Sequence, residues 1–411
     1  MNTIAVIGGG AAGIMAAVAA AKNPLCHVVL IEKNEKIGKK MLITGGGRCN
    51  ITNTDDALEM IDKVQRNPRF LYSALCGLNS AAMCEFLHNI GIATKTEDGG
   101  RVFPVSDNSL DIVNAFEAYL RKLKVKLMLN CDVTEISKEE PNDFIVKTGN
   151  GGIIKASAVI IATGGLAAPN TGSTGDGYKF AQKMGHDVTK LHPALVPLIS
   201  KESFLKDLTG LSFSGIGLAV EANGKKIYKD RGDIIITHFG LSGPMVLRAS
   251  SRIADINSPV RFYLDFMPDE DENDVDKHIL DIINKNLNKD IINALEGLLP
   301  ERLLPVILQS ADVKPYIKAR DITKDKRRRI CSIIKGFCIE ISGNMGFGGA
   351  VITCGGVSCK EINPKTMESK LITCLYFAGE VMDVDAFTGG YNLQIAFSTG
   401  YLAGKSAAGG F

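Results

Sequence analysis

TIAVIGGGAAG, residues 3–13, is the stretch of sequence that decides the fold of this chain. Residues 3–7 form a β-branched run typical of a buried parallel strand. Residues 8–13 fit the pattern G-x-G-x-x-G and open an alanine-rich helix that extends to Ala21. A second strand at 27–31 leads to Glu32, about 20 residues beyond the glycines, where dinucleotide-binding folds carry an acid. Together these features predict a Rossmann-like βαβ unit.

The glycine turn predicts how such a unit would hold a dinucleotide. Gly8 permits the tight turn after the strand, Gly10 lets a pyrophosphate approach the backbone, and Gly13 lets the helix pack on the strand. The helix N-terminus offers free N–H groups and the positive end of its dipole to the phosphates. The Glu32 carboxylate is suited to accept hydrogen bonds from a ribose and would repel a 2′-phosphate. It therefore favours FAD or NAD over NADP.

Residues 33–53, KNEKIGKKMLITGGGRCNITN, help to decide between FAD and NAD. In NAD dehydrogenases the chain usually continues into another helix, whereas this stretch is basic and then reaches GGGRCN at 45–50. Adjacent glycines do not form a stable helix, so we expect backbone that passes close to a second extended ligand. Arg48 and Asn50 would reach phosphate or ring oxygens. The pattern favours FAD.

Motifs along nearly the whole chain carry a resemblance to a known family. They are VIGGGAAG (6–13), IEK (31–33), GKK (38–40), TGGGRCNITN (44–53), GRVFPVS (100–106), ATGG (162–165), TGSTGDG (171–177), THFGLSGP (237–244), ITCGGV (352–357), TMESK (366–370) and YFAGEVMDVDAFTGGYNLQIAFSTG (376–400). On these motifs the chain resembles the BaiN-like and aminoacetone oxidase-like FAD-dependent oxidoreductases, which are related to the fumarate reductase flavoprotein group. The last motif is the most specific, and the match is weakest over 270–330.

The resemblance implies a Rossmann-like FAD-binding domain of the two-dinucleotide-binding-fold type. The apolar run 158–162 would return to the sheet beside the first strand, and Val133 would meet the adenine through its backbone. Glu380, after a third short strand, would lie on the ribityl chain. The helix that opens at 388–393 would turn its N–H groups toward the flavin pyrimidine edge, where negative charge collects on reduction. By their own pattern, residues 131–156 predict a small β-meander with turns at 141–143 and 149–152.

The length of 411 residues predicts two or three domains, and the sequence pattern changes twice in the middle of the chain. We predict an α/β protein in which the FAD-binding domain receives an inserted β-barrel-like cap and a small helical subdomain. The ranges are 1–190 and 341–411 for the FAD-binding domain, 191–268 and 321–340 for the β-rich cap, and 269–320 for the helical subdomain. Ligands favour the seams between domains, so the substrate is expected between cap and flavin ring.

Three residues are candidates for catalysis. His238, in THFGLSGP, has a side chain suited to proton transfer, but it would equally serve to hold a loop. Tyr391 would face the flavin as a hydroxyl donor or pack against it, and Arg48 would anchor FAD or a substrate carboxylate. Cys49 has no neighbouring cysteine, so close packing is favoured over a redox role. The histidines expected to be structural or exposed are His186, His192 and His278.

The predicted cofactor site combines these segments. Its residues are Gly8, Gly10, Ala11, Ala12, Gly13, Glu32, Lys33, Lys40, Gly46, Gly47, Arg48, Cys49, Asn50, Val133, Thr163, Gly164, Gly379, Glu380, Asn392 and Leu393. FAD would bind non-covalently, and no residue spacing predicts a metal site. No second glycine fingerprint has a strand before it and an acid after it, so a dedicated nicotinamide domain is not expected. NADH or NADPH would dock transiently as the reductant.

Composition limits the partners and the compartment. The net charge of +2 provides no field that would hold a nucleic acid or an anionic membrane, so we expect a small-molecule substrate and neither of those partners. The basic run 326–329 is expected to be a solvated helix face. The apolar run 4–21 is interrupted by glycines and has no basic residue before it, unlike a signal peptide. Ten scattered cysteines without a C-x-x-C pair predict a reducing, cytoplasmic compartment.

The sequence thus favours an FAD-dependent oxidoreductase that transfers a hydride between flavin N5 and a small organic substrate. The resemblance implies two reactions. One is NAD(P)H-driven reduction of an activated C=C bond in a steroid- or bile-acid-like enone, and the other is oxygen-dependent oxidation of a small amine or aminoketone. The large cap favours the first. A flavin-binding protein that acts through a partner or RNA is an alternative of another class. The sequence does not indicate the physiological substrate or the oligomeric state.

Overall fold

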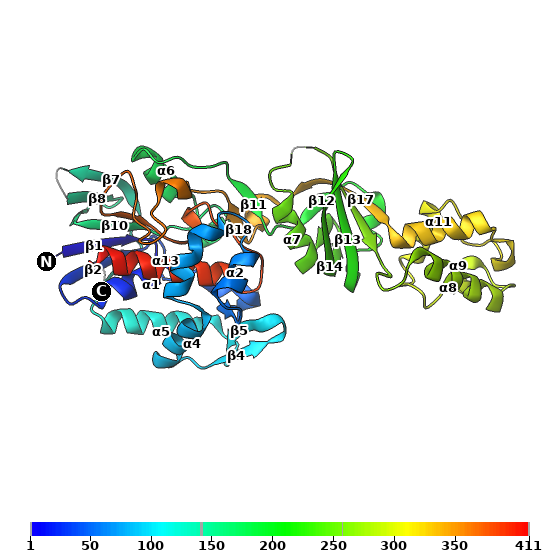
Figure 1. Cartoon of the computed structure of the whole chain (residues 1–411), viewed down its shortest axis with the longest axis horizontal. Coiled ribbons are helices and arrows are strands. Elements are labelled where there is room, and N and C mark those ends of the chain that lie inside the picture. The colour runs from blue at the N-terminus through cyan, green and yellow to red at the C-terminus, as the bar shows by residue number, and fades with distance from the viewer. Residues whose placement is uncertain (1, 140–142, 257, 410–411) are drawn as a thin grey trace. The chain divides into compact units, whose positions relative to one another are not determined.

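The two ends of the chain meet in one parallel sheet (Figure 1). In the computed structural model, which describes residues 2–139, 143–256 and 258–409, the strand order is β19-β10-β1-β2-β6. The strands are β1 (Asn2–Ile7), β2 (Cys26–Ile31), β6 (Lys126–Met128), β10 (Ala158–Ile161) and β19 (Leu375–Phe377). β10 pairs with β1 on one side and with β19 on the other, which confirms the predicted return strand. The Rossmann-like architecture is therefore confirmed.

Helices α1 (Ala11–Ala21) and α13 (Tyr391–Ala407) pack directly on each other. A Cβ atom at Gly400 would lie 2.1 Å from the carbonyl oxygen of Ala12, and one at Gly404 would lie 2.1 Å from that of Ala16. Only glycine permits so close an approach of two backbones. Because both contacts advance by four residues, the helices run parallel. The N-terminus of α13 therefore extends beyond that of α1 by about two turns, or about 12 Å.

Small antiparallel sheets accompany the parallel sheet. They are β7 (Val133–Glu139) with β8 (Asp143–Thr148) and β9 (Ile153–Ala156), β3 (Thr52–Asn53) with β5 (Arg101–Pro104) and β4 (Thr94–Glu97), and β11 (His192–Ala194) with β18 (Ile352–Cys354). The first of these confirms the predicted meander, and its turn at 149–152 is present. The turn predicted at 141–143 includes residues outside the described ranges.

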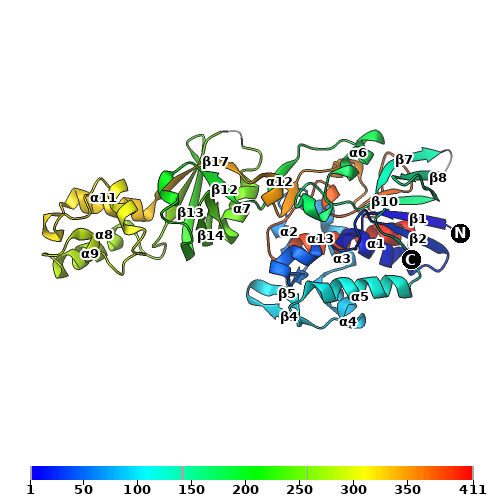
Figure 2. The ribbon, with the colours of Figure 1, turned by 180° about the vertical axis from the view of Figure 1, so that it is seen from behind.

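Helices cover the first unit, which comprises Met1–Ala194 and Phe347–Phe411. They include α2 (Ala57–Lys63), α3 (Tyr72–Gly77), α4 (Ser80–Asn89), α5 (Ser109–Lys122) and α6 (Asp176–Lys183). The amphipathic α5 buries Ile112, Val113, Phe116 and Leu120 in the core. It lies on the side of the parallel sheet opposite to β7 and β8 (Figure 2).

The inserted second unit, Leu195–Gly346, is built on a closed barrel. The barrel strands, in order, are β12 (Leu198–Ser200), β15 (Gly240–Ser242), β14 (Lys225–Thr237), β13 (Ser212–Ala222), β16 (Val260–Asp265) and β17 (Phe337–Asn344). Its helices are α7 (Pro244–Arg252), α8 (Glu272–Lys285), α9 (Ile291–Ala294), α10 (Leu304–Ser310) and α11 (Lys324–Lys335), and the short α12 (Gly346–Gly349) begins at the last residue of this unit. The predicted barrel and helices are thus confirmed, and one buried core contains both barrel residues such as Phe262 and helix residues such as Ile279.

One apolar helical stretch of the described residues, Pro68–Asn89, is long enough by length and composition to cross a membrane. Its backbone leaves the helical conformation at Leu78, which has φ −142° and ψ 86° and separates α3 from α4. Leu71, Leu75 and Leu87 are buried in the core of the first unit. These residues therefore serve the packing of the fold.

Candidate functional site

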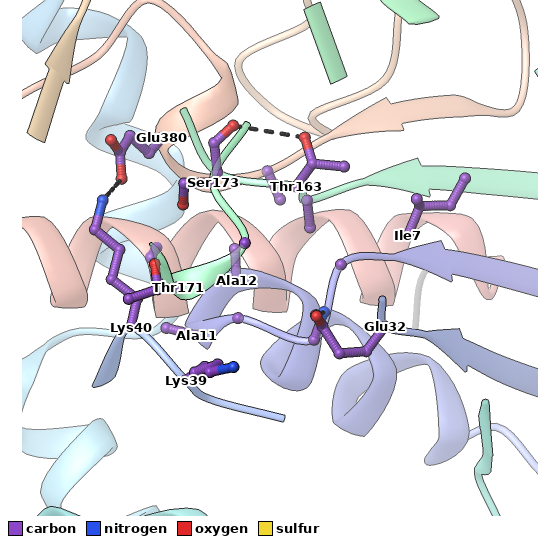
Figure 3. Close-up of a pocket in the computed structure, with 18 of the residues that line it drawn as sticks. Ile7, Ala11, Ala12, Glu32, Lys39, Lys40, Thr163, Thr171, Ser173 and Glu380 are labelled. Atoms are coloured by element: carbon purple, nitrogen blue, oxygen red, sulfur yellow. Dashed lines mark hydrogen bonds and ion pairs between the residues drawn. The ribbon is translucent and has the colours of Figure 1, made fainter. Parts of the chain in front are cut away.

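A pocket lies where β1, β2 and β10 end, at the carboxyl edge of the parallel sheet (Figure 3). It encloses about 1290 Å³ of space, including its opening to solvent. The lining residues fall within 7–12, 31–44, 131–133, 162–180, 351–352 and 378–396. Open α/β sheets bind their ligands at this edge. Both ends of the chain therefore contribute to one site.

The first glycine turn has the geometry that the sequence predicts. Gly8 has φ +102°, and a Cβ atom there would lie 2.5 Å from the Ala162 carbonyl oxygen. A Cβ atom at Gly13 would lie 1.8 Å from the Gly8 carbonyl oxygen, so α1 packs on the turn only without a side chain. Gly10 lines the pocket, and a Cβ atom there would have no heavy atom within 4 Å. Gly8 and Gly13 shape the turn, whereas Gly10 leaves space for a ligand.

Two helix N-termini open into the pocket. α1 begins without a side-chain cap or an acidic residue in its first turn, and its Ala11 and Ala12 line the pocket. α13 also begins without a side-chain cap, and its Asn392 and Leu393 line the pocket. Uncapped N-terminal N–H groups and the positive dipole end favour an anion or a group that gains negative charge. The site therefore offers two electropositive points, separated along the helix axes.

Glu32 follows β2 and has both carboxylate oxygens engaged. Oε2 accepts from the Gly9 N–H at 2.6 Å, and Oε1 accepts from the backbone N–H of Asn34 at 2.8 Å and from its side-chain amide at 2.7 Å. The residue lines the pocket and is 8% exposed. A carboxylate has about four acceptor sites. These three bonds fix the orientation of Glu32 and leave acceptor capacity for a ribose hydroxyl.

Among the lysines of the basic stretch that line the pocket, Lys33 and Lys40 each pair with an acid. Lys40 Nζ lies 2.7 Å from Glu380 Oε2, and Glu380 Oε1 accepts from the Thr353 N–H at 2.9 Å. Lys33 Nζ lies 2.7 Å from Asp176 Oδ2. The pairs fix these side chains at the pocket wall and neutralise part of the positive charge there.

Most of the residues predicted to bind the cofactor lie together. Those that line the pocket are Gly8, Gly10, Ala11, Ala12, Glu32, Lys33, Lys40, Val133, Thr163, Gly164, Glu380, Asn392 and Leu393. Those that do not are Gly13, Gly46, Gly47, Arg48, Cys49, Asn50 and Gly379. Gly13 and Gly379 pack against backbone and helix instead. A Cβ atom at Gly379, which has φ +76°, would lie 2.8 Å from the Ala12 Cβ atom.

The second glycine turn lies outside the pocket lining, so its contact with the cofactor stays a prediction. Met41–Gly47 forms a 3-10 segment that is interrupted at residues 44–46, and Gly45 and Gly46 have φ +57° and +68°. A Cβ atom at Gly45 would lie 2.9 Å from the Phe103 ring and from the Asn50 backbone nitrogen. This glycine therefore serves the turn itself. Met41 and Thr44, before it, do line the pocket.

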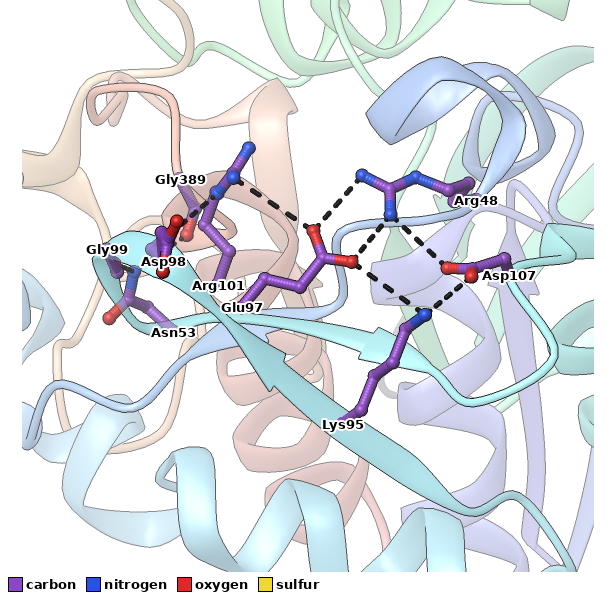
Figure 4. Close-up of polar contacts among 9 residues, drawn as sticks. All are labelled: Arg48, Asn53, Lys95, Glu97, Asp98, Gly99, Arg101, Asp107 and Gly389. Carbon is purple, nitrogen blue, oxygen red and sulfur yellow. Dashed lines mark hydrogen bonds and ion pairs between the residues drawn. The ribbon is translucent and has the colours of Figure 1, made fainter.

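Arg48 is bound to acidic side chains of the β4–β5 region (Figure 4). It donates two hydrogen bonds to Glu97, at 2.7 and 3.2 Å, and one to Asp107 at 3.3 Å. Its guanidinium also lies 4.1 Å from the Phe103 ring centroid. The hydrogen bond from Arg48 lowers the pKa of Glu97, so the pair stays charged. Arg48 thus anchors the second turn, and its role as a catalytic candidate stays a prediction.

Cys49 and Asn50 also have structural positions. Cys49 is fully buried with φ +63°, and burial raises the pKa of its thiol to about 11, as close packing predicts. The Asn50 amide, oriented by its neighbours, donates to the Thr52 carbonyl oxygen at 3.1 Å and accepts from the Gly390 N–H at 3.0 Å. Gly390 is the N-cap residue of α13. The second turn therefore supports the N-terminus of α13.

The remaining catalytic candidates lie in different units. Tyr391, at the start of α13, donates its hydroxyl to Asp55 Oδ2 at 2.8 Å, and burial together with this bond raises the pKa of the phenol. His238 lies in the turn between β14 and β15 of the second unit, with an exposed side chain. Their catalytic roles stay predictions.

The buried His186 contacts Ser369 Oγ at 2.8 Å and Glu361 Oε2 at 3.1 Å, which is a structural role.

The sequence analysis missed one wall of the pocket. Its lining residues are Thr171, Gly172, Ser173 and Asp176, and the sequence analysis also missed Asn34 and Lys39 among the lining residues. The motif TGSTGDG at 171–177 contained the signal, because glycines spaced by polar residues permit tight backbone close to a ligand. The pairing of this wall with Asn34 depends on contacts across the fold, which no local pattern indicates.

FAD fits the residues present. The uncapped start of α1 would receive the pyrophosphate, and Glu32 would accept from the adenosine ribose. The start of α13, which extends about 12 Å beyond the start of α1, would receive the flavin ring. Bound FAD would supply reversible two-electron chemistry.

A family model described as the HI0933-like protein Rossmann domain matches residues 2–406. The chain belongs to this family. It is 34% identical over 412 residues to the 3-dehydro-bile acid delta(4,6)-reductase of Clostridium scindens, with 99% of both chains covered. This match confirms the resemblance found in the sequence. The HI0933-like chain described here is thus an FAD-dependent oxidoreductase.

Other similar proteins differ in the activity that their names describe. The chain is 30% identical over 401 residues to the ribosomal RNA dihydrouridine synthase of Escherichia coli, with 97% of this chain and 96% of the relative covered. The crystal structure of 3-ketosteroid delta1-dehydrogenase from Sterolibacterium denitrificans aligns with a TM-score of 0.51 at 15% identity, over 99% of this chain and 100% of that chain. The last comparison supports the fold alone.

Proposed function

We propose that this enzyme reduces a carbon–carbon double bond conjugated to a carbonyl group, with electrons from NADH or NADPH. The observation that carries the proposal is the full-length similarity to a relative named as a 3-dehydro-bile acid delta(4,6)-reductase. A dihydrouridine synthase likewise produces a saturated C–C bond next to a carbonyl, in a uracil ring. The two relatives differ in substrate but share the type of bond that is reduced. A steroid-like enone is the proposed substrate class.

The reduction adds one hydride and one proton across the double bond. The nicotinamide supplies the hydride and is oxidised, and the solvent supplies the proton through a group of the protein. The uncapped N-terminus of α13 would stabilise negative charge at the pyrimidine edge of the bound cofactor. His238 is the proposed proton donor, because imidazole is the side chain suited to proton transfer at neutral pH. Tyr391 is less suited, because its proton is donated to Asp55.

Steady-state assays test this function. The purified protein with FAD is expected to oxidise NADH or NADPH only when a 3-oxo steroid with conjugated double bonds is present, and mass spectrometry should show the gain of two hydrogens. His238→Ala is expected to lower turnover and leave the flavin spectrum intact. Oxygen consumption with an aminoketone, without nicotinamide, would instead support the oxidase alternative.

A second candidate substrate is a uracil ring of ribosomal RNA, which the similarity to the Escherichia coli synthase favours. The low net charge of +2 argues against tight binding of RNA by the chain as a whole. The exclusion of nucleic acid nevertheless stays a prediction. Measurement of dihydrouridine in ribosomal RNA incubated with the enzyme, FAD and NADPH tests this candidate. Its formation, together with inactivity on steroid enones, would replace the first substrate class and keep the bond type.

A further inference from the structure

Asn34 joins two walls of the pocket. Its Nδ2 atom donates to Glu32 Oε1 at 2.7 Å and to the Thr171 carbonyl oxygen at 3.0 Å. Its backbone N–H donates to the same Glu32 oxygen at 2.8 Å. One residue therefore fixes the carboxylate that would accept from a ribose, and it connects this carboxylate to the segment that begins at Thr171.

That segment, residues 171–176, forms the facing wall. Thr171, Gly172 and Asp176 line the pocket. Gly172 has φ +98°, and a Cβ atom there would lie 2.5 Å from Asn34 Nδ2. A side chain at this position would therefore displace Asn34. The glycine in TGSTGDG is thus required for the contact between the two walls.

Lys33 makes a second connection between the walls. Its Nζ atom lies 2.7 Å from Asp176 Oδ2 and also donates to Thr174 Oγ1. The side chains of Lys33 and Asp176 are 29% and 33% exposed, so solvent only partly screens the pair. The hydrogen bonds from Lys33 and Thr174 contribute to a lowered pKa of Asp176, which keeps the carboxylate charged.

We propose that Lys33, Asn34 and residues 171–176 form a clasp that closes the pocket at the adenosine end and slows the release of FAD. Asn34 is a positioning residue in this clasp, because it acts on the ribose through the Glu32 carboxylate. A cofactor whose ribose lies against Glu32 is covered on this side while both connections persist. The inference rests on the proposed function, because it requires that FAD occupies the pocket.

The first test measures the release of FAD from Asn34→Ala. Loss of the hydrogen bonds to Glu32 and Thr171 is expected to speed release about five- to tenfold. The visible spectrum of the bound flavin should stay unchanged, because the ring lies at the other end of the pocket. Lys36→Ala is the matched control, since Lys36 is an exposed residue of the same turn. Unchanged release from Asn34→Ala overturns the clasp. An altered flavin spectrum together with a lower melting temperature also overturns it, because a general structural role would explain both.

The second test separates the clasp from a direct contact between Lys33 and a phosphate. Lys33→Met is expected to speed release about two- to fivefold at low salt and less at high salt. In an Asp176→Asn background the same substitution should have little further effect. A full additional effect there would show that Lys33 acts on the cofactor directly and would overturn its part in the clasp. Lys179→Met is the control. Lys179 pairs with the same carboxylate at 3.4 Å, but it lies in α6 like Asp176, so this pair does not connect the two walls of the pocket.

The outcomes distinguish this inference from the proposed function. A wild-type protein that binds no FAD contradicts both. A wild-type protein that holds FAD and reduces an enone, while all clasp variants release FAD at the same rate as their controls, contradicts only the clasp. Tight FAD binding without any reductase activity contradicts only the proposed reaction.

Discussion

The two glycine turns, residues 8–13 and 45–50, use the same residue for different purposes. Gly8 and Gly13 shape a turn that places Gly10 and the start of α1 at the pocket. The second turn places its glycines outside the lining, and Gly45 packs against the Phe103 ring. Glycine content alone therefore indicates a tight turn of the backbone and does not by itself identify a ligand-binding site. The strand before the first turn and the helix after it are what identify the binding site.

The second turn nevertheless contributes to the site through another element. The Asn50 amide contacts the Gly390 N–H, and the Asn53 amide donates to the Gly389 carbonyl oxygen at 3.0 Å (Figure 4). A Cβ atom at Gly390 would lie 2.2 Å from the Thr52 carbonyl oxygen. The segment after the second turn thus holds the N-terminus of α13 in place. The first turn would bind the cofactor directly, and the second supports the helix that would bind its ring.

Gly13→Ala is expected to have the largest effect among substitutions in the two turns. The new methyl group would overlap the Gly8 carbonyl oxygen at 1.8 Å, and this atom belongs to the backbone and not to a flexible side chain. We expect a loss of at least about 3 kcal/mol in the free energy of unfolding, at the upper end for overpacking. Chemical denaturation of the apoprotein measures it. A variant as stable as the wild type would contradict the close packing of α1 on the turn.

Gly10→Ala should separate ligand binding from folding. Gly10 has φ −77°, and its Cβ position is open, so alanine fits the protein without strain. The methyl group would occupy space in the pocket at the α1 N-terminus. We expect an apoprotein with wild-type stability and an affinity for FAD that is lower by at least about tenfold, or about 1.4 kcal/mol. Wild-type affinity in this variant would remove the pyrophosphate from this position.

Gly45→Ala should lower the stability of the protein more than its affinity for FAD. Its φ of +57° and the nearby Phe103 ring make alanine strained and crowded, at a cost of about 1–3 kcal/mol in stability. The folded fraction should lose less FAD affinity than Gly10→Ala, because Gly45 lies outside the pocket lining. Thermal melting and FAD titration of the same preparation make the comparison. A larger loss of affinity than in Gly10→Ala would show that the second turn contacts the cofactor directly.

The smallest expected effect concerns Cys49, whose thiol should not react with an alkylating reagent. Burial raises the pKa of its thiol to about 11, so at pH 8 it is both protonated and inaccessible. Cys76 is exposed and serves as the internal control. Iodoacetamide followed by peptide mass mapping should label Cys76 and leave Cys49 unmodified. The raised pKa also means that the Cys49 contribution to stability is present at neutral pH and is lost as the pH rises past about 8.5 toward 11.

The first βαβ unit could be predicted from the sequence because all of its determinants are local. The strand, the turn glycines, the helix and Glu32 lie within one short segment, and each has a fixed geometric task. The return strand β10 and the start of α13 followed from the family resemblance. Their place beside β1 and α1 depends on pairings across more than 150 residues, such as Ile4 with Ala158.

The part that could not be predicted depends on side chains that meet only in the fold. The sequence predicted that Arg48 would reach phosphate or ring oxygens, but it did not indicate the ion pairs of Arg48 with Glu97 and Asp107. Asn34 gave no local signal, because its partner Thr171 lies on the other wall of the pocket. The residue types show that Arg48 and Asn34 are polar, but they do not indicate which side chain or carbonyl group each one contacts in the fold.

The absorbance spectrum of the purified protein, recorded before and after incubation with FAD and gel filtration, tests the central claim most directly. The claim is that the start of α1 and the start of α13 hold one extended FAD between them. It predicts a flavin spectrum that stays with the wild-type protein through the column and is weaker in Gly10→Ala. A folded wild-type protein that remains colourless after exposure to FAD would contradict it.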